Sequence, residues 1–337
     1  MDGGAIMAPP KLLLLYQDRD LPSSRVRVLN LLPKLIQHGI DATAAEYPRK
    51  LRDKLRLLKE LSGYDLVFLQ KKMPAMPEAY LLRSFSAKLI FDFDDAIYMK
   101  DDNARDSSSK TRLNRFRNIV GKADLVVAGN PILADFAVKF NPRVEVLPSA
   151  VPVEEVPVKE RGHNNERLLI GWVGGGLNLH HLAMIAAPLQ RLSREIDFEL
   201  RVVSDREFRA AGVTVRNIPW SLERQEAEIA QFDIGIMPLP KNDWTAGKCS
   251  YKLLQYMAAA VPVVATDWGF NRSLIKNGET GYLAENPDDF YSCIKLLSTN
   301  PESARKMGLR GRSLVEIDFS IAAVGKRLAA IISRVAA

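Results

Sequence analysis

Residues 167–182, RLLIGWVGGGLNLHHL, have the pattern of a buried strand, a glycine turn and a helix. An apolar run is followed by three glycines, Gly174, Gly175 and Gly176, and then by sequence typical of a helix that begins near Asn178. Short apolar runs of this kind are typical of strands that are buried on both faces of a parallel sheet. Glycines in such a turn let the backbone approach a ligand closely, and the helix N-terminus offers free N–H groups to a phosphate. A tight strand-to-helix turn without a ligand is the alternative.

The same alternation of apolar runs and amphipathic stretches extends in both directions along the chain. The predicted strands of the second half include FELRVVSD, VTVRNIPW, DIGIMPLP and VPVVATDWG, and those of the first half are KLLLLYQ, DATAAEYP, DLVFLQK, AKLIFDFDD and ADLVVAGN. A stretch rich in proline and charge separates the two series near residues 148–160. With 337 residues, the chain has the length of two domains. We therefore predict an α/β protein with two doubly wound, Rossmann-like parallel-sheet domains that face a shared cleft.

Composition excludes several classes of protein. Hydrophobic residues make up 47% and charged residues 26%, which is ordinary for a globular chain. No apolar run reaches the roughly 18 residues that span a bilayer, so we expect a cytoplasmic protein. Cys249 and Cys293 are too few for a disulfide framework or a cysteine-rich zinc site. The four histidines have no metal-type spacing, and no metal site is predicted.

The net positive charge is concentrated in the first half of the chain. Residues 1–150 carry 24 Lys/Arg against 18 Asp/Glu, whereas residues 151–337 carry 23 against 22. The formal charge of +7 is thus almost entirely that of the first half. This asymmetry favours an anionic partner for the first domain, with a solvated basic surface as the alternative. No nucleic-acid motif is present, and nucleic acid is not an expected partner.

The segment GKCSYKLLQYMAAAVPVVAT, residues 247–266, carries two lysines four positions apart. On a helix that begins there, Lys248 and Lys252 would share one face beside the positive end of the helix dipole. Two cations in this position call for an anion, and a diphosphate is a suitable one. Solvated surface lysines are the alternative.

Three carboxylates follow a predicted strand of the first half, in AKLIFDFDDAIY. In an extended chain, Asp92 and Asp94 share one face and Asp95 points away. Such carboxylates bind sugar hydroxyls, act as a general base or hold a divalent cation. Alternatively, Asp95 caps the following helix.

Residues 49–59 form a basic amphipathic segment, with six Lys/Arg and interspersed leucines. The pattern is suited to an anionic membrane surface, and an ordinary surface helix with a basic face is the alternative.

The second-half segments GWVGGG, FDIGIMPLP, GKCSYKLLQYMAAAVPVVAT and NGETGYL resemble the C-terminal domain of family-4 glycosyltransferases, which have the GT-B fold. The first-half segments SSRVRVLNLLPKLIQHGI, IFDFDDAIY, ADLVVAGNPILADFA and VEVLPSAV resemble the N-terminal, acceptor-side domain of the same family. The resemblance covers roughly residues 11–335. It implies an acceptor-side domain at 11–150 with the C-terminal helix 318–337 packed on it, and a donor-binding domain at 151–317.

The family transfers a sugar from a nucleotide-diphosphate sugar to an acceptor with retention of anomeric configuration and without an obligatory metal or other cofactor. Carried over, the resemblance assigns catalytic roles to Lys248 and Lys252, which would neutralise the leaving diphosphate. It also places two groups of residues around the reaction. The donor would be bound by Gly174, Gly175, Gly176, Asp243, Gln255 and Trp220. On the acceptor side we expect Ser24, Arg25, Asp95 and Asn130, with Asp92 and Asp94 as catalytic carboxylates.

The chain departs from the family's paired-glutamate motif, whose two positions fall on Gly247 and Gln255. Gln255 can still bond ribose hydroxyls, and Asp243 is the nearest acid that could replace the first glutamate. We therefore keep three hypotheses: a retaining glycosyltransferase of polysaccharide or glycolipid assembly, a non-catalytic nucleotide-sugar-binding subunit, and a GT-B sugar-nucleotide epimerase. The expected partners are a nucleotide sugar and a sugar or lipid-linked acceptor, with a peripheral location at the inner face of the cell membrane.

Overall fold

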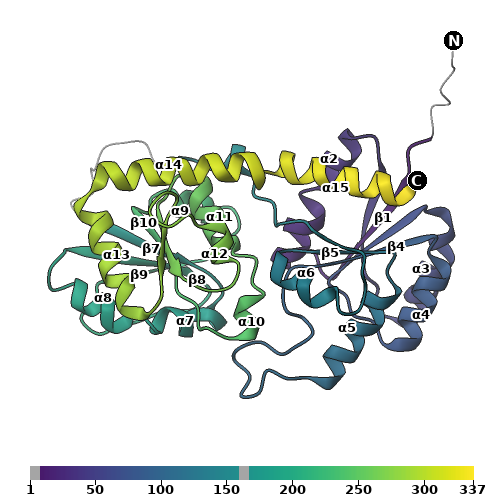
Figure 1. The fold of residues 1–337 in the computed structure, drawn as a ribbon, viewed down its shortest axis with the longest axis horizontal. Coiled ribbons are helices and arrows are strands. Elements are labelled where there is room, and N and C mark those ends of the chain that lie inside the picture. Colours follow the sequence, from purple (N-terminus) through teal and green to yellow (C-terminus); the bar gives the residue numbers. More distant parts are fainter. Residues whose placement is uncertain (1–7, 159–166) are drawn as a thin grey trace, which may run out of the picture. The chain divides into compact units, whose positions relative to one another are not determined.

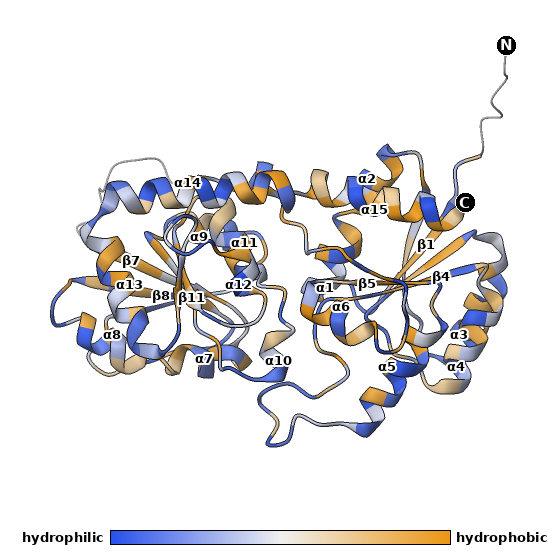
Figure 2. Ribbon diagram, viewed as in Figure 1, coloured by the Kyte–Doolittle hydropathy of each residue, from blue (hydrophilic) through white to orange (hydrophobic). Residues whose placement is uncertain are grey.

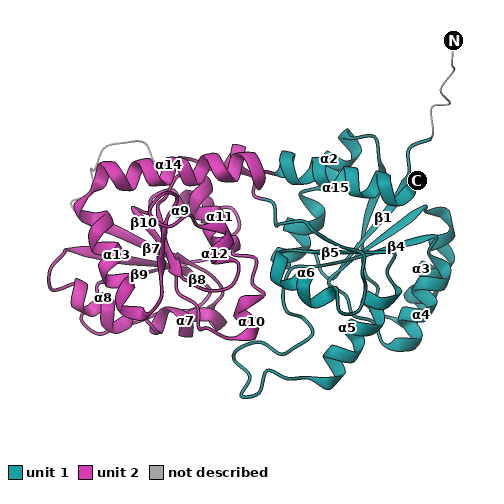
Figure 3. Cartoon of the chain, in the orientation of Figure 1, with its two compact units in different colours: residues 1–150, 321–337 teal, residues 151–320 magenta. Residues whose placement is uncertain are grey.

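The computed structural model describes residues 8–158 and 167–337, so the end of the predicted junction, residues 159–160, lies outside the described residues. The chain divides into two compact units. The first comprises residues 1–150 and 321–337 and the second residues 151–320, as Figure 3 shows in two colours. The C-terminal segment thus returns to the unit that contains the N-terminal half.

The first unit contains a six-stranded sheet in which all strands are parallel, in the order β2-β1-β3-β4-β5-β6. Its strands are β1 Lys11–Tyr16, β2 Asp41–Glu46, β3 Leu66–Gln70, β4 Lys88–Phe93, β5 Leu125–Ala128 and β6 Val144–Val146. The four interior strands β1, β3, β4 and β5 are buried almost throughout, as the apolar runs predict. In Figure 2 the strand labelled β1 of this sheet is mainly orange, the colour of hydrophobic residues.

Helices cover both faces of this sheet (Figure 1). They are α1 Pro22–Ser24, the π-helical η1 Arg25–Leu29, α2 Leu32–Gln37, α3 Leu51–Glu60, the 3₁₀ turn η2 Leu61–Gly63, α4 Met76–Phe85, α5 Lys110–Lys122, α6 Pro131–Ala137 and α15 Ile321–Ala336. The helix α15 packs against α2, where a Cβ added to Gly325 would lie 2.7 Å from the Lys34 Cβ. Gly39 ends the α2 region with a φ of 79°, a conformation that side chains disfavour.

The second unit contains another six-stranded parallel sheet, in the order β12-β11-β10-β7-β8-β9. Its strands are β7 Leu168–Val173, β8 Phe198–Ser204, β9 Val215–Pro219, β10 Ile234–Met237, β11 Val263–Thr266 and β12 Tyr282–Ala284. The predicted fold class, α/β with two parallel sheets flanked by helices, is confirmed.

The helical elements of the second unit are mostly short. They are η3 Val153–Glu155, η4 Gly176–Asn178, α7 Leu179–Ala183, α8 Ala186–Leu192, α9 Gln225–Ile229, α10 Asp243–Ala246, α11 Tyr251–Ala258, α12 Asn271–Leu274, α13 Pro287–Thr299 and α14 Pro301–Asp318. Close packing in this unit depends on Gly171 of β7, because an added Cβ would lie 2.0 Å from the ring of Phe232. That ring is itself buried, with 1% of its surface exposed.

Candidate functional site

The residues expected to bind a donor gather at the carboxyl edge of the second sheet. The strand β7 ends at Val173, and the three glycines lead from it into η4 and α7. The predicted helix start near Asn178 is therefore confirmed within one residue. In open α/β sheets, ligands bind outside the carboxyl ends of the strands.

The ammonium group of Lys252 lies directly against the first glycine of this turn. A Cβ added to Gly174 would lie 2.6 Å from Lys252 Nζ and 2.8 Å from the ring of Trp172. The same Nζ lies 4.3 Å from the centroid of the Trp172 ring, which is completely buried. The absence of a side chain at Gly174 thus makes room for a cation beside the backbone.

The helix α11 is held in place by Tyr256, one turn after Lys252. The Val173 N–H donates a hydrogen bond of 2.9 Å to the Tyr256 hydroxyl. Residues four apart lie on the same helix face, so this bond fixes the end of β7 and the position of the Lys252 side chain together. Lys252 and the glycine turn are 78 positions apart in the sequence, and packing brings them together.

The N–H groups of the glycine turn are partly engaged within the protein. The Gly174 N–H donates to the Val203 carbonyl at 3.0 Å, and the Gly176 N–H donates to a carboxylate oxygen of Asp205. This second bond holds the pKa of Asp205 below its usual value. The side chain of Arg206 covers Gly176, with its Cγ 2.4 Å from where a Cβ would be. Asp205 and Arg206 were missed by the sequence analysis, and their position just after a strand end was the available signal.

Lys248 does not lie on the same helix as Lys252, so that expectation is wrong. The helix α11 begins at Tyr251, and Lys248 lies in the turn between α10 and α11. Ser250 takes a left-handed conformation with a φ of 53°, and its hydroxyl donates a hydrogen bond of 2.7 Å to Asn271. This pinned turn interrupts the helix that the lysine spacing suggested. Lys248 Nζ instead lies 5.7 Å from the ring centroid of Trp244.

Gln255 is paired with an acid that the sequence analysis did not identify. Its side-chain amide donates a hydrogen bond of 3.0 Å to Glu226 Oε1, and Gln255 is only 3% exposed. The other carboxylate oxygen, Glu226 Oε2, is buried without a hydrogen-bond partner among the described residues. Burial raises the pKa of Glu226, and the bond from Gln255 opposes that shift. A buried acceptor without a partner is costly, so this oxygen is suited to a ligand hydroxyl.

The other two expected donor-side residues are more accessible. Trp220 follows β9, is 38% exposed and donates from its indole N–H to Gln225 Oε1 at 3.0 Å. Asp243 is the first residue of α10 and its side chain is exposed. Trp220 is therefore not a core residue.

In the first unit, Asp92 forms a buried ion pair at the end of β4. Both of its oxygens accept hydrogen bonds from the Arg27 guanidinium, and both side chains are at most 1% exposed. Arg27 also donates to the Leu147 carbonyl at 2.6 Å. The pair therefore joins η1, β4 and the segment after β6. Arg27 was not singled out by the sequence analysis.

Asp94 and Asp95 share one partner, Lys71, whereas Asp92 pairs with Arg27. Lys71 Nζ lies 2.9 Å from Asp94 Oδ1 and also bonds Asp95. Burial alone would lower the pKa of Lys71, but the charges of Asp94 and Asp95 outweigh it and raise that pKa. Because β4 ends at Phe93, the alternation of an extended strand does not continue to Asp94. Asp95 does not cap a helix, since the next helix begins at Lys110.

The remaining acceptor-side residues lie near strand ends of the first unit. Ser24 is buried in α1, and its hydroxyl has no hydrogen-bond partner in the part of the chain that is described. Arg25 donates to the Asp20 carbonyl at 2.6 Å. Asn130 caps α6, where its side chain accepts a hydrogen bond of 2.9 Å from the Leu133 N–H.

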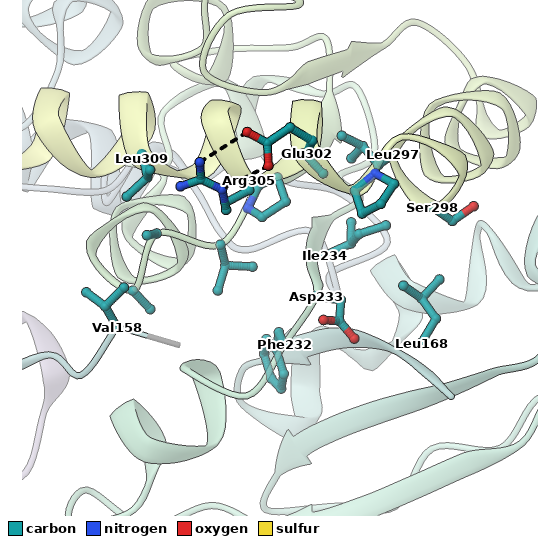
Figure 4. Close-up of a pocket in the computed structure, with 16 residues that line it drawn as sticks. Val158, Leu168, Phe232, Asp233, Ile234, Leu297, Ser298, Glu302, Arg305 and Leu309 are labelled. Atoms are coloured by element: carbon teal, nitrogen blue, oxygen red, sulfur yellow. Dashed lines mark hydrogen bonds and ion pairs between the residues drawn. The ribbon is translucent and has the colours of Figure 1, made fainter. Parts of the chain in front are cut away.

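The second unit also contains a cavity of about 430 Å³, whose lining Figure 4 shows. It lies at the amino ends of the strands, beside Leu168 of β7, Ile234 of β10 and the Pro262 that precedes β11. The glycine turn and Lys252 lie at the opposite, carboxyl edge. The cavity and the candidate ligand-binding residues therefore lie at opposite edges of the sheet. We place the candidate site at the carboxyl edge, where the glycine turn and Lys252 meet.

Comparison with known proteins gives a family match in the second unit. Residues 167–300 match the family described as Glycosyl transferases group 1. No curated protein matches the chain in sequence.

Several solved structures have the same fold. The structure of HepE from Anabaena in complex with UDP and glucose has 13% identity and a TM-score of 0.70, covering 96% of this chain and 100% of that one. Sucrose-phosphate synthase from Thermosynechococcus elongatus has 12% identity and a TM-score of 0.73, covering 96% and 98%. A glycosyltransferase from Rickettsia africae has 13% identity and a TM-score of 0.75, covering 97% and 98%. The chain therefore has the GT-B fold, and its residues 167–300 match the glycosyl transferases group 1 family.

Proposed function

We propose that the protein is a glycosyltransferase that transfers a sugar from a nucleotide-diphosphate sugar to an acceptor, with retention of anomeric configuration. The observation that carries the proposal is the Lys252 ammonium lying against Gly174 at the carboxyl edge of the second sheet. HepE, which shares the fold, was solved with UDP and glucose and with UDP-glucose. A donor of this class places a diphosphate at the strand ends, where Lys252 would meet it.

In this proposal the second unit, residues 151–320, binds the donor. The glycine turn lets the diphosphate approach the backbone, and Lys252 and Lys248 neutralise its charge. Negative charge on the diphosphate grows as the bond to the sugar breaks. A cation held beside it by packing therefore stabilises the transition state more than the ground state.

Gln255 and Glu226 would together bind the ribose hydroxyls. Gln255 stands at the family's second glutamate position, and it brings the unpartnered Glu226 Oε2 with it. Trp220 would stack on the base, and Asp243 would contact the donor sugar. The pair thus restores a carboxylate that the sequence alone lacks at position 255.

The first unit, residues 1–150 and 321–337 with the helix α15, would supply the acceptor side. Ser24, Arg25, Asp95 and Asn130 belong to this side in the proposal. Of the two catalytic candidates, Asp94 has 12% of its side chain exposed and Asp92 has none. Asp94, which pairs with Lys71, is thus the better placed to contact an acceptor hydroxyl, while Asp92 would act by positioning Arg27.

The proposed setting is polysaccharide or glycolipid assembly at the cytoplasmic face of a membrane, with a sugar or lipid-linked acceptor. The basic segment 49–59 favours an anionic membrane surface. None of the helices in the described residues is long and apolar enough to cross a bilayer. Association would therefore be peripheral.

A screen of thermal unfolding with UDP, GDP, ADP and dTDP tests donor binding. A nucleoside diphosphate at 100 times its Kd should raise the free energy of unfolding by about 2.7 kcal/mol. Failure of every nucleoside diphosphate to raise the melting temperature would refute the proposal.

Product analysis then separates the three hypotheses. With the preferred donor and an acceptor panel, NMR should show a glycoside with the donor's anomeric configuration. Binding without any product would favour a non-catalytic subunit. An epimerised nucleotide sugar formed from donor alone would favour an epimerase.

A further inference from the structure

The outward face of α4 is apolar although it is exposed. Six positions of this helix are exposed, and Ser84 is the one that is neither apolar nor aromatic; the other five are Met76, Pro77, Tyr80, Leu81 and Phe85. Exposed fractions are 61% for Met76, 64% for Tyr80 and 46% for Phe85. Single exposed hydrophobic residues are normal, but a whole helix face without charge indicates an interaction site. We call Met76, Tyr80, Leu81 and Phe85 the α4 face.

The neighbouring helix α3 extends this apolar surface. Leu51 and Leu55, one turn apart, are 72% and 50% exposed. The two helices are linked by an ion pair of 2.6 Å between Lys54 of α3 and Glu78 of α4. Glu78 also accepts a hydrogen bond of 2.8 Å from Tyr47. The one acidic residue of α4 is thus already neutralised.

Cations flank the apolar residues on both sides. The helix α5 carries five Lys/Arg and no Asp/Glu: Lys110, Arg112, Arg115, Arg117 and Lys122. On α3 the exposed cations are Arg52, Arg56 and Lys59. Among the described residues, Arg56, Lys59, Lys110 and Arg115 form no ion pair.

These helices form one continuous surface. The helices α3, α4 and α5 make the consecutive crossovers β2 to β3, β3 to β4 and β4 to β5, which proceed in one direction across the sheet and therefore lie on one face of it. Lys122 of α5 lies 5.8 Å from the Tyr80 ring, and Lys54 and Lys72 both lie within 6.0 Å of the Tyr47 ring. Burial lowers the pKa of Lys72, and the charge of Lys54 adds to the shift. The margin of the α4 face thus carries a positive field.

An apolar strip with basic margins matches the surface of an anionic bilayer. Apolar side chains enter the boundary between headgroups and acyl chains, while Lys and Arg meet the anionic headgroups. A nucleic acid would use the cations but leave Met76, Leu81 and Phe85 without a partner. We propose that the α4 face, with the cations of α3 and α5 beside it, docks the protein on anionic lipid membranes. The centre of the membrane-binding surface is then α4 and not segment 49–59. This proposal rests on the proposed function only in that the protein would meet a lipid-linked acceptor at the membrane.

Vesicle flotation of the full chain tests this surface. We expect binding to vesicles with 30% phosphatidylglycerol in phosphatidylcholine, and weak binding to pure phosphatidylcholine. Tyr80→Ser with Phe85→Ser should reduce the bound fraction at least about tenfold, because both apolar side chains then lose their place in the bilayer boundary. Ile36→Ser is the matched control, because Ile36 is 55% exposed on α2 of the same unit, outside this surface. It should leave binding unchanged.

Charge reversal is tested separately. Lys110→Glu with Arg115→Glu should also weaken binding at least tenfold, since each Lys/Arg near the surface contributes measurably. Lys326→Glu, on an exposed position of α15, is its control.

Three results would overturn the docking surface: no binding to anionic vesicles, equal binding to neutral ones, or equal binding of the α4-face variant and the Ile36 control. Binding of RNA that the α4-face variant retains, without vesicle binding, would assign the cations to a nucleic acid instead. Nucleoside diphosphate binding by the same variants distinguishes the two proposals. Vesicle binding without it would refute the donor proposal alone, and the reverse would refute the docking surface alone.

Discussion

Replacing Lys252 by methionine tests the central contact of the donor site. Methionine keeps an unbranched side chain of similar length, so packing against Trp172 and Gly174 is preserved while the charge is removed. In the native chain the ammonium lies 4.3 Å from the Trp172 ring centroid and beside the Gly174 backbone. The substitution therefore separates the role of the charge from that of the side-chain volume.

The expected magnitude follows from the interactions that are lost. A hydrogen bond to a charged group contributes about 1.5 to 3 kcal/mol, so the Kd for a nucleoside diphosphate should rise about 10- to 150-fold. Loss of the cation over Trp172 should cost at most about 1 kcal/mol of stability, because this side chain is half-buried. The contact of the methionine sulfur with the ring offsets part of that cost. Binding should thus change far more than folding.

Isothermal titration calorimetry measures the first quantity and urea unfolding the second. Lys276→Met is the matched control, since Lys276 is exposed in the same unit and away from the glycine turn. It should change neither the Kd nor the urea midpoint. A Lys252→Met protein that binds the nucleoside diphosphate within twofold of the native Kd would refute the reasoning. A loss of binding matched by an equal loss of stability would indicate a purely structural lysine.

Three further predictions concern the second unit. Gly174→Ala should displace the Lys252 ammonium group and so weaken nucleoside diphosphate binding about tenfold in calorimetry. Gly175→Ala should change the Kd less than twofold, because its added Cβ would have its nearest neighbour at 3.9 Å. Equal effects of the two substitutions would contradict the steric argument. Gly171→Ala should lower the free energy of unfolding by about 3 kcal/mol, because its Cβ would overlap the buried Phe232 ring, and an unchanged urea midpoint would exclude this packing. Burial raises the pKa of Glu226 above its usual 4.5, so its contribution to stability is present below that pH and is lost as the pH rises through the raised pKa. Urea midpoints between pH 4 and 7 should therefore fall less steeply with pH for Glu226→Gln than for the native chain, and parallel curves would show that the carboxyl is not desolvated.

The strands and the approximate site could be predicted from the sequence because their signals are local. A run such as Leu12–Leu15 is apolar at every position, which is typical of a strand covered on both faces, and the structure buries all four side chains. Glycines after Val173 indicate a close backbone approach for an equally local reason. The sequence also showed that acidic residues follow β4, but it did not predict that Asp94 and Asp95 both pair with Lys71.

Pairings between distant positions could not be predicted in this way. The Arg27–Asp92 pair joins residues 65 positions apart, and Gln255 meets Glu226 across 29 positions. Lys248 shows the converse, since a spacing of four suggested one helix face and the left-handed Ser250 placed it in a turn. A spacing of four residues places two side chains on one helix face only if the helix is uninterrupted between them.

Local patterns in the sequence are enough to predict two parallel sheets, their apolar strands and the glycine turn, because backbone sterics and hydrophobic burial act over a few neighbouring residues. Three features follow from the packing of distant segments: Lys252 occupies the space left open by Gly174, Glu226 supplies a carboxylate beside Gln255, and α4 turns an apolar face outward. Each of these depends on strand register and helix packing, which no local pattern specifies.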